Sequence, residues 1–175
     1  MLAYVFVLAV IAARLLLRPL AFAPVGAALL FFGARAPRKL LWVPLALLTV
    51  TDLYLTLAVY GQGLKADQIV TSAWYLAVLL LGSAFLKRAV KPVRVLVSAL
   101  GASVSFFVLS NFTVWAVWPT YPKTLSGLAA CYVAAIPFFR NQVASDVFFT
   151  AVMFAIPMAI EALRSGESHD HIRAA

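Results

Sequence analysis

The sequence predicts an all-α integral membrane protein, a helical bundle of six transmembrane helices with a short re-entrant or interfacial helix at about 125–139. Two observations support this prediction. Hydrophobic residues make up 65% of the 175 residues and charged residues only 11%, whereas soluble domains are about 25% charged. The apolar residues also fall into blocks, and about 20 apolar helical residues cross a bilayer core. We therefore expect one transmembrane domain over 1–164 and a polar, disordered tail over 165–175.

The first three apolar blocks lie before residue 61. Leu2–Leu17 ends with Arg14 and Arg18, whose long side chains can extend their charges to the membrane interface. The second block, Pro24–Arg35, has some 12 residues, which is short for a crossing, so we expect it to tilt, to lie partly in the interface or to extend backwards. Leu40–Tyr60 is long enough for a full span.

The later blocks follow a polar turn at 61–67. Ile69–Leu86 and Val95–Trp118 are each long enough to cross the bilayer. The segment Leu125–Phe139 has only 15 residues, and it is therefore expected to re-enter the membrane or to lie within the protein. Val147–Leu163 is expected to form the sixth span.

The basic residues indicate how these spans are oriented. In the six-span arrangement both termini lie on one side of the membrane, and the two sides carry nine and five basic residues. The nine are Arg35, Arg38, Lys39, Lys87, Arg88, Lys91, Arg94, Arg164 and Arg173, and the five are Arg14, Arg18, Lys65, Lys123 and Arg140. Because cytoplasmic segments are rich in Lys and Arg, we expect both termini in the cytoplasm. A seven-span arrangement places eight basic residues on one side of the membrane and six on the other.

Composition also argues against several classes of protein. The 14 Lys and Arg residues exceed the 6 Asp and Glu residues, but they gather at the ends of apolar blocks and form no basic stripe on one helix, so no nucleic-acid partner is expected. The two histidines, His169 and His171, lie in the tail, and no catalytic triad, metal-binding motif or phosphate-binding glycine loop occurs. We expect no enzyme activity, no metal and no cofactor. An enzyme acting on lipids would call for an intramembrane cluster of acids or histidines, and the blocks contain none.

Polar residues inside the blocks are the candidate functional residues, because an ionisable group at membrane depth is costly. Asp52 lies in the middle of the third block near three threonines, and we expect it either to face a ligand cavity or to pair with an arginine of another helix. Asn111 either lines the same cavity or cross-links helices. The segment 118–146 is rich in prolines and polar residues and is expected to form a binding loop or an interfacial loop. The predicted substrate-binding residues are Asp52, Asn111, Trp115, Tyr121, Lys123, Tyr132, Arg140, Asn141 and Asp146.

Four strings of residues resemble a bacterial family of small, uncharacterised polytopic membrane proteins. They are FAPVGAALLFFGAR, VPLALLTVTDLYL, SNFTVW and YPKTLSGLAACYVAAIPFFRN, and the resemblance covers about residues 10–155. The layout is in turn loosely similar to the S components of energy-coupling-factor vitamin transporters. That resemblance implies six helices, cytoplasmic termini, a vitamin-like substrate and an AxxxA pair in the first helix, here Ala9 and Ala13, which docks an energising subunit.

The function expected from the sequence is therefore that of a transport subunit in the bacterial inner membrane. It would bind a small molecule for uptake, with membrane lipids and an ATPase module as partners. The alternative is a non-catalytic accessory or assembly subunit of a larger membrane complex, in which the same polar residues hold helices together.

Overall fold

The protein is all-α over the residues that the structure describes. The computed structural model describes residues 1–16, 24–87 and 90–173, which contain six α-helices and no strand. The helices are α1 (Leu2–Leu16), α2 (Val25–Arg35), α3 (Trp42–Tyr54), α4 (Ala66–Leu81), α5 (Pro92–Val117) and α6 (Leu125–Arg173). A 3₁₀ turn, Arg38–Leu40, precedes α3, and π-helical turns extend α3 over Leu55–Val59 and α4 over Gly82–Leu86.

Three of these helical stretches are long and apolar enough to cross a membrane. They are Arg38–Val59, Ala66–Leu86 and Pro92–Val117, with 22, 21 and 26 residues. Their bounds match the third, fourth and fifth blocks of the sequence to within a few residues. The prediction of an all-α chain with membrane-crossing helices is confirmed to this extent.

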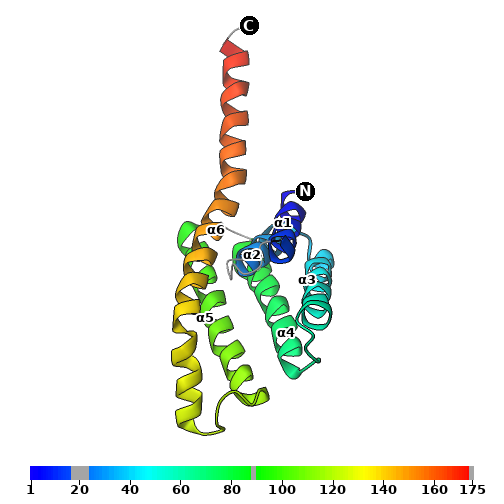
Figure 1. Ribbon diagram of the computed structural model, residues 1–175. Helices are drawn as coiled ribbons and strands as arrows, with labels where there is room; N and C mark the ends of the chain where they lie inside the picture. Colours follow the sequence, from blue (N-terminus) through cyan, green and yellow to red (C-terminus); the bar gives the residue numbers. More distant parts are fainter. Residues whose placement is uncertain (17–23, 88–89, 174–175) are drawn as a thin grey trace.

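The short helix α2 lies in the interior of the bundle (Figure 1), where it contacts α1, α4, α5 and α6. Every residue from Gly26 to Ala34 is buried. Glycines allow this close packing, since a methyl group at Gly33 would overlap the carbonyl group of Leu79, and one at Gly82 would overlap that of Leu30. Small residues at helix crossings let backbones approach one another in membrane proteins. The second block is therefore buried by protein.

The last two apolar blocks form one helix. We expected a separate re-entrant or interfacial helix at about 125–139, but α6 continues without a break from Leu125 to Arg173, and this part of the prediction is wrong. The polar residues between the blocks do not require a loop, because a helix satisfies its own backbone groups. The exposed Arg140 and Asn141 project outwards, and Asp146 finds partners on neighbouring helices.

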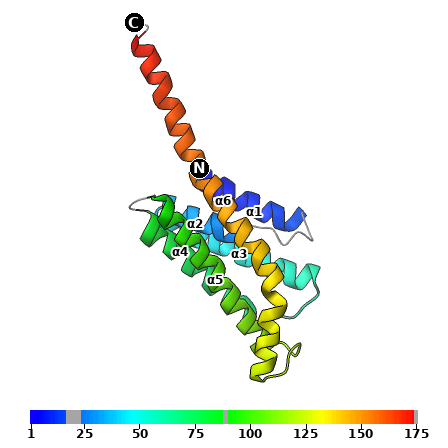
Figure 2. The same cartoon turned by 90° about the vertical axis from the view of Figure 1, so that its left-hand side faces the viewer.

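The far end of α6 leaves the bundle. The sequence predicts a disordered tail over 165–175, and the helix continues through most of that range, to Arg173. Figure 1 and the turned view in Figure 2 both show this end of α6 extending away from the other five helices. Within the bundle, α6 packs beside α5.

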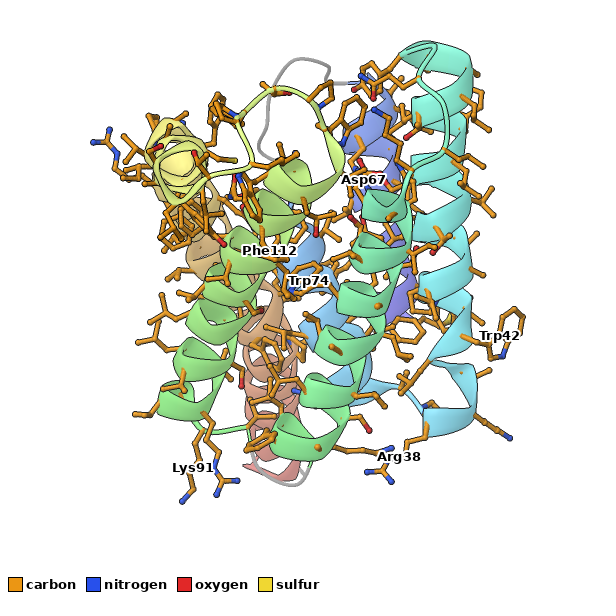
Figure 3. The ribbon with its side chains drawn as sticks, turned by 90° about the horizontal axis from the view of Figure 1, so that it is seen from below. Arg38, Trp42, Asp67, Trp74, Lys91 and Phe112 are labelled. Carbon is orange, nitrogen blue, oxygen red and sulfur yellow. The ribbon has the colours of Figure 1, made fainter. Side chains whose placement is uncertain are left out.

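The two ends of the bundle differ in charge. Figure 3 shows Arg38 and Lys91 at one end and Asp67 at the other. Arg35 and Lys87 belong to the first end as well, because Arg35 directly precedes the Arg38 turn and the Lys87 ammonium donates to the carbonyl oxygen of Ala36 at 3.3 Å. We call this the basic end. Arg18 and Arg88 lie outside the described residues.

Candidate functional site

Three ionisable side chains from three helices meet inside the bundle. The Arg14 guanidinium of α1 forms an ion pair with the Asp52 carboxylate of α3 at 2.6 Å. The Tyr75 hydroxyl of α4 donates to the other oxygen of Asp52 at 2.6 Å and accepts a hydrogen bond from Arg14 at 3.2 Å. The three groups therefore form a closed triangle, which we call the Arg14 cluster.

Burial explains why these side chains are paired. Asp52 is 8% exposed and Tyr75 is 3% exposed. A carboxylate without a partner is very costly in such surroundings, and a close cation with an additional hydrogen bond offsets much of that cost. Of the two sequence-based alternatives for Asp52, pairing with an arginine of another helix is the arrangement in the structure.

Arg14 retains some access to the surroundings. Its side chain is 23% exposed, against 10% for the side chain of Asp52. A guanidinium has five N–H donors, and its contacts to Asp52 and Tyr75 use two of them. Arg14 can therefore hold Asp52 and still present further donors.

Hydrogen bonds between α3 and α4 fix the position of Asp52. The hydroxyl groups of Thr49 and Ser72 lie 3.1 Å apart, and the Gln68 amide donates to the Thr56 hydroxyl at 2.7 Å. These two contacts lie on either side of Asp52 along the chain. Together they set the register of α3 against α4, which is what brings Tyr75 within reach of Asp52.

The second buried carboxylate, Asp146, belongs to a different cluster. It is 3% exposed, and it accepts a hydrogen bond from the Ser103 hydroxyl of α5 at 2.8 Å. It also accepts from the backbone N–H group of Ala27 in the first turn of α2. The first turn of a helix carries unpaired N–H groups, and no side chain of its own N-cap residue, Pro24, caps α2. Asp146 supplies that cap from α6.

Gly26 leaves room for this cap. A Cβ atom at Gly26 would lie 3.2 Å from the Asp146 carboxylate, a closer approach than most side chains tolerate. Among the described residues no cation pairs with Asp146, so the positive end of the α2 dipole supplies the favourable electrostatics. Two buried hydroxyl groups nearby in the chain, Ser145 Oγ and Thr150 Oγ1, have no hydrogen-bond partner within the described part of the chain.

The remaining predicted residues lie along the contact between α5 and α6. The Asn111 amide donates to the carbonyl oxygen of Phe107 in its own helix at 2.8 Å. The Tyr132 hydroxyl donates to the carbonyl oxygen of Val108 at 2.7 Å, which ties α6 to α5. The buried Cys131 thiol lies 3.4 Å from the carbonyl oxygen of Asn111. Asn111 and Tyr132 therefore cross-link helices or satisfy backbone groups.

The turn between α5 and α6 is held by its own side chains. The Trp115 indole donates to the carbonyl oxygen of Pro122 at 2.8 Å. The Lys123 ammonium donates to the carbonyl oxygens of Trp118, at 2.7 Å, and of Trp115. Lys123 thus caps the C-terminus of α5, where a cation is favourable. Tyr121 is half-buried in the same turn, and both Arg140 and Asn141 are exposed.

The nine predicted substrate-binding residues are therefore not brought together at one place. Asp52 lies in the Arg14 cluster, Asp146 caps α2, and the other seven lie on the α5–α6 contact, in its turn or on the outer surface. Arg14 and Tyr75 were not predicted as the partners of Asp52. One signal for the Arg14 pairing was its position near the end of an apolar block. The prediction from that position was that its charge extends to the membrane interface.

The proposed docking residues and the metal sites can also be compared with the structure. Ala9 is exposed and Ala13 is half-buried on α1, whose opposite face packs through Ala3, Val7 and Val10. Among the described residues no group of three or more His, Cys, Asp or Glu side chains is placed to hold a metal ion.

Comparison with known proteins gives one match. No curated protein and no solved structure matches the chain. A family of unknown function (DUF6580) matches residues 1–166, which include all of α1 to α5 and the Arg14 and Asp146 clusters. The chain therefore belongs to this family of unknown function.

Proposed function

We propose that the chain crosses the membrane six times with both termini in the cytoplasm. The six helices described alternate in direction between the two ends of the bundle. Near the basic end, one surface depression is lined by Met1, Arg35, Pro37 and Pro157. The N-terminus and the point where α6 leaves the bundle are thus at the basic end. Since Lys and Arg are retained on the cytoplasmic side, the basic end is the cytoplasmic one. A reporter fused after Ala175 tests this topology, and extracytoplasmic activity of the reporter would contradict it.

On this topology the Arg14 cluster lies in the outer half of the membrane. Asp52 is seven residues from Val59, which is about 10 Å along the helix at 1.5 Å per residue. Tyr75 is nine residues from Ala66, about 14 Å from the corresponding end of α4. A charged group at this depth is the usual mark of a substrate or ion site in a membrane protein.

The function that we propose is substrate capture for uptake, by a non-catalytic subunit similar to the S components of vitamin transporters. One observation carries this proposal, the partly exposed Arg14 guanidinium, which is fixed by Asp52 and Tyr75 and has donors to spare. It suits a small molecule with a carboxylate or another planar anionic group, which a guanidinium binds through two parallel hydrogen bonds. The membrane that we propose for this subunit is the inner membrane of a bacterium.

The outer face of α1 suits a partner subunit. Ala9 and Ala12 are exposed there beside Val5 and Leu8, which are each 55% exposed. Small residues on an exposed helix face allow a second helix to pack closely. An energising ATPase module is the partner that uptake requires, because this chain has no nucleotide-binding motif.

The experiment compares single and double variants of the cluster. Asp52→Asn and Arg14→Gln each leave one charge unpaired, whereas the double variant Arg14→Met with Asp52→Leu removes both and keeps the site filled. If the cluster binds substrate, the double variant folds but loses uptake by at least tenfold. Lys39→Gln, at the exposed cytoplasmic end, is the matched control. A folded double variant with full uptake would remove the cluster from substrate binding.

A second candidate function, an accessory or assembly subunit, is favoured by a specific observation. Most of the polar side chains predicted to bind substrate are paired with the protein itself, while apolar side chains such as Phe138, at 67% exposed, and Trp42, at 64%, project outwards. Purification in mild detergent distinguishes the two functions. Recovery with an ATPase module supports uptake, and stoichiometric recovery with a respiratory or photosynthetic complex supports the accessory function.

A further inference from the structure

An apolar groove opens between α5 and α6 near the basic end. It has a volume of about 240 Å³, and its walls are formed by Val95, Leu96 and Ala99 of α5 and by Ala151, Phe154 and Ala155 of α6. The neighbouring side chains on α5 are apolar and open to the surroundings, with Val93 71% and Val97 63% exposed. A hydrocarbon chain is therefore a chemically suitable occupant.

Positive charge lies at the mouth of this groove. Lys91 stands between two residues that line it, Val90 and Pro92, and Arg94 immediately precedes the lining residue Val95. Both basic side chains are exposed, and in Figure 3 the Lys91 side chain points outwards from the end of the bundle. Within the described part of the chain neither has a carboxylate partner, because the single ion pair is Arg14 with Asp52.

One further feature favours an anionic occupant. The N-terminus of α5 lies at the same mouth, and the side chain of its N-cap residue, Lys91, makes no capping hydrogen bond, so its first N–H groups attract negative charge.

We propose that the groove between α5 and α6 binds an anionic phospholipid of the cytoplasmic leaflet. One acyl chain lies against Val95, Ala99 and Phe154, and the headgroup phosphate lies between Lys91 and Arg94. Basic residues beside a crevice between transmembrane helices are a recurring way of retaining anionic lipids. The choice of the cytoplasmic leaflet rests on the topology proposed above, whereas the binding itself does not depend on what the protein transports or assembles with.

The test uses the full-length protein in detergent and measures lipid binding by native mass spectrometry. The probes are phosphatidylglycerol and, as a zwitterionic comparison, phosphatidylcholine with the same acyl chains. We expect the wild-type protein to retain phosphatidylglycerol in preference. The variant Lys91→Gln with Arg94→Gln should lose that preference and bind phosphatidylglycerol about tenfold more weakly, since each basic residue near a headgroup contributes severalfold to binding. Lys39→Gln, which changes a basic residue away from the groove, should bind as the wild-type does.

A second variant tests the groove itself. Ala151→Trp fills it and should abolish the retained lipid, whereas Ala134→Trp, on an exposed position of α6 outside the groove, should not. Melting temperatures of each variant identify any that fail to fold, and in that case the charge variant alone decides. Equal binding of both lipids by the wild-type protein would overturn the proposal. So would a dimer that Ala151→Trp dissociates, because the groove would then hold a second copy of the chain.

Discussion

The two buried carboxylates of this bundle are stabilised in different ways. Asp52 pairs with a cation, Arg14, and accepts a hydrogen bond from Tyr75. Asp146 has no cation partner among the described residues and accepts hydrogen bonds from the Ser103 hydroxyl and from a backbone N–H group at the start of α2. Both are at most 8% exposed, so the difference lies in their partners and not in their burial.

The position of Asp52 therefore requires a negative charge, whereas the position of Asp146 requires only a hydrogen-bond acceptor. Removal of Asp52 leaves a guanidinium inside the bundle without its counter-charge. Removal of Asp146 leaves only neutral donors unpaired, and a neutral oxygen can replace the carboxylate there. Substitutions that change charge and hydrogen bonding separately therefore test the comparison directly.

The largest effect is expected at Asp52. Asp52→Leu should lower the free energy of unfolding by about 3 kcal/mol, because Arg14 is then buried without a counter-charge. The measurement is equilibrium unfolding in mixed micelles. The double variant with Arg14→Met should regain most of the loss, since an apolar pair of similar volume often replaces a buried ion pair without cost. A double variant as unstable as the single one would show that packing, and not charge, determines the effect.

A smaller effect with a different pattern is expected at Asp146. Asp146→Ala should cost about 2 kcal/mol, because the first turn of α2 loses its cap and Ser103 loses its acceptor. Asp146→Asn keeps an acceptor oxygen and leaves no cation unpaired. It should therefore lower the free energy of unfolding by less than about 1 kcal/mol. The same unfolding measurement distinguishes the two. If Asn and Ala at this position were equally destabilising, Asp146 would depend on charge as Asp52 does.

The part of the fold that follows from the sequence is the part set by local composition. The blocks behind Arg38–Val59, Ala66–Leu86 and Pro92–Val117 are continuous, apolar and long, and hydrocarbon admits few other structures for such segments. The continuity of α6 was not predictable in this way. Its polar residues near 140–146 predicted a loop. Gln142 of α6 is one partner of Asp146, but the Ser103 and Ala27 partners that make this carboxylate tolerable within a helix come from α5 and α2, more than 40 residues away in the chain.

The candidate site shows the same limit. The position of Asp52 inside an apolar block indicated a buried carboxylate with a partner, and pairing with an arginine was one of the two alternatives. The sequence contains 14 Lys and Arg residues, and the choice of Arg14 depends on how far α1 is shifted along α3. That shift is set by tertiary packing, including the burial of Val7 and Val10 of α1. Tyr75 carried no signal of its own, because an isolated tyrosine in an apolar block is common.

The smallest effect that still sharpens the comparison is expected at Tyr75. Tyr75→Phe removes the hydroxyl that donates to Asp52 and accepts from Arg14, while the ion pair itself remains. Hydrogen bonds between membrane helices contribute about 0.6 kcal/mol on average and up to about 1.7 kcal/mol, so we expect a loss of about 1 kcal/mol in the free energy of unfolding. Tyr54→Phe is the matched control, since Tyr54 is 53% exposed on the outer face of α3 and its substitution should have no measurable effect. In the double variant that lacks both charges, Tyr75→Phe should become nearly neutral, because the hydroxyl then has no charged partner to lose. A full loss in that background would mean that the Tyr75 hydroxyl stabilises the bundle through groups other than Asp52 and Arg14, and the Arg14 cluster would reduce to a simple ion pair.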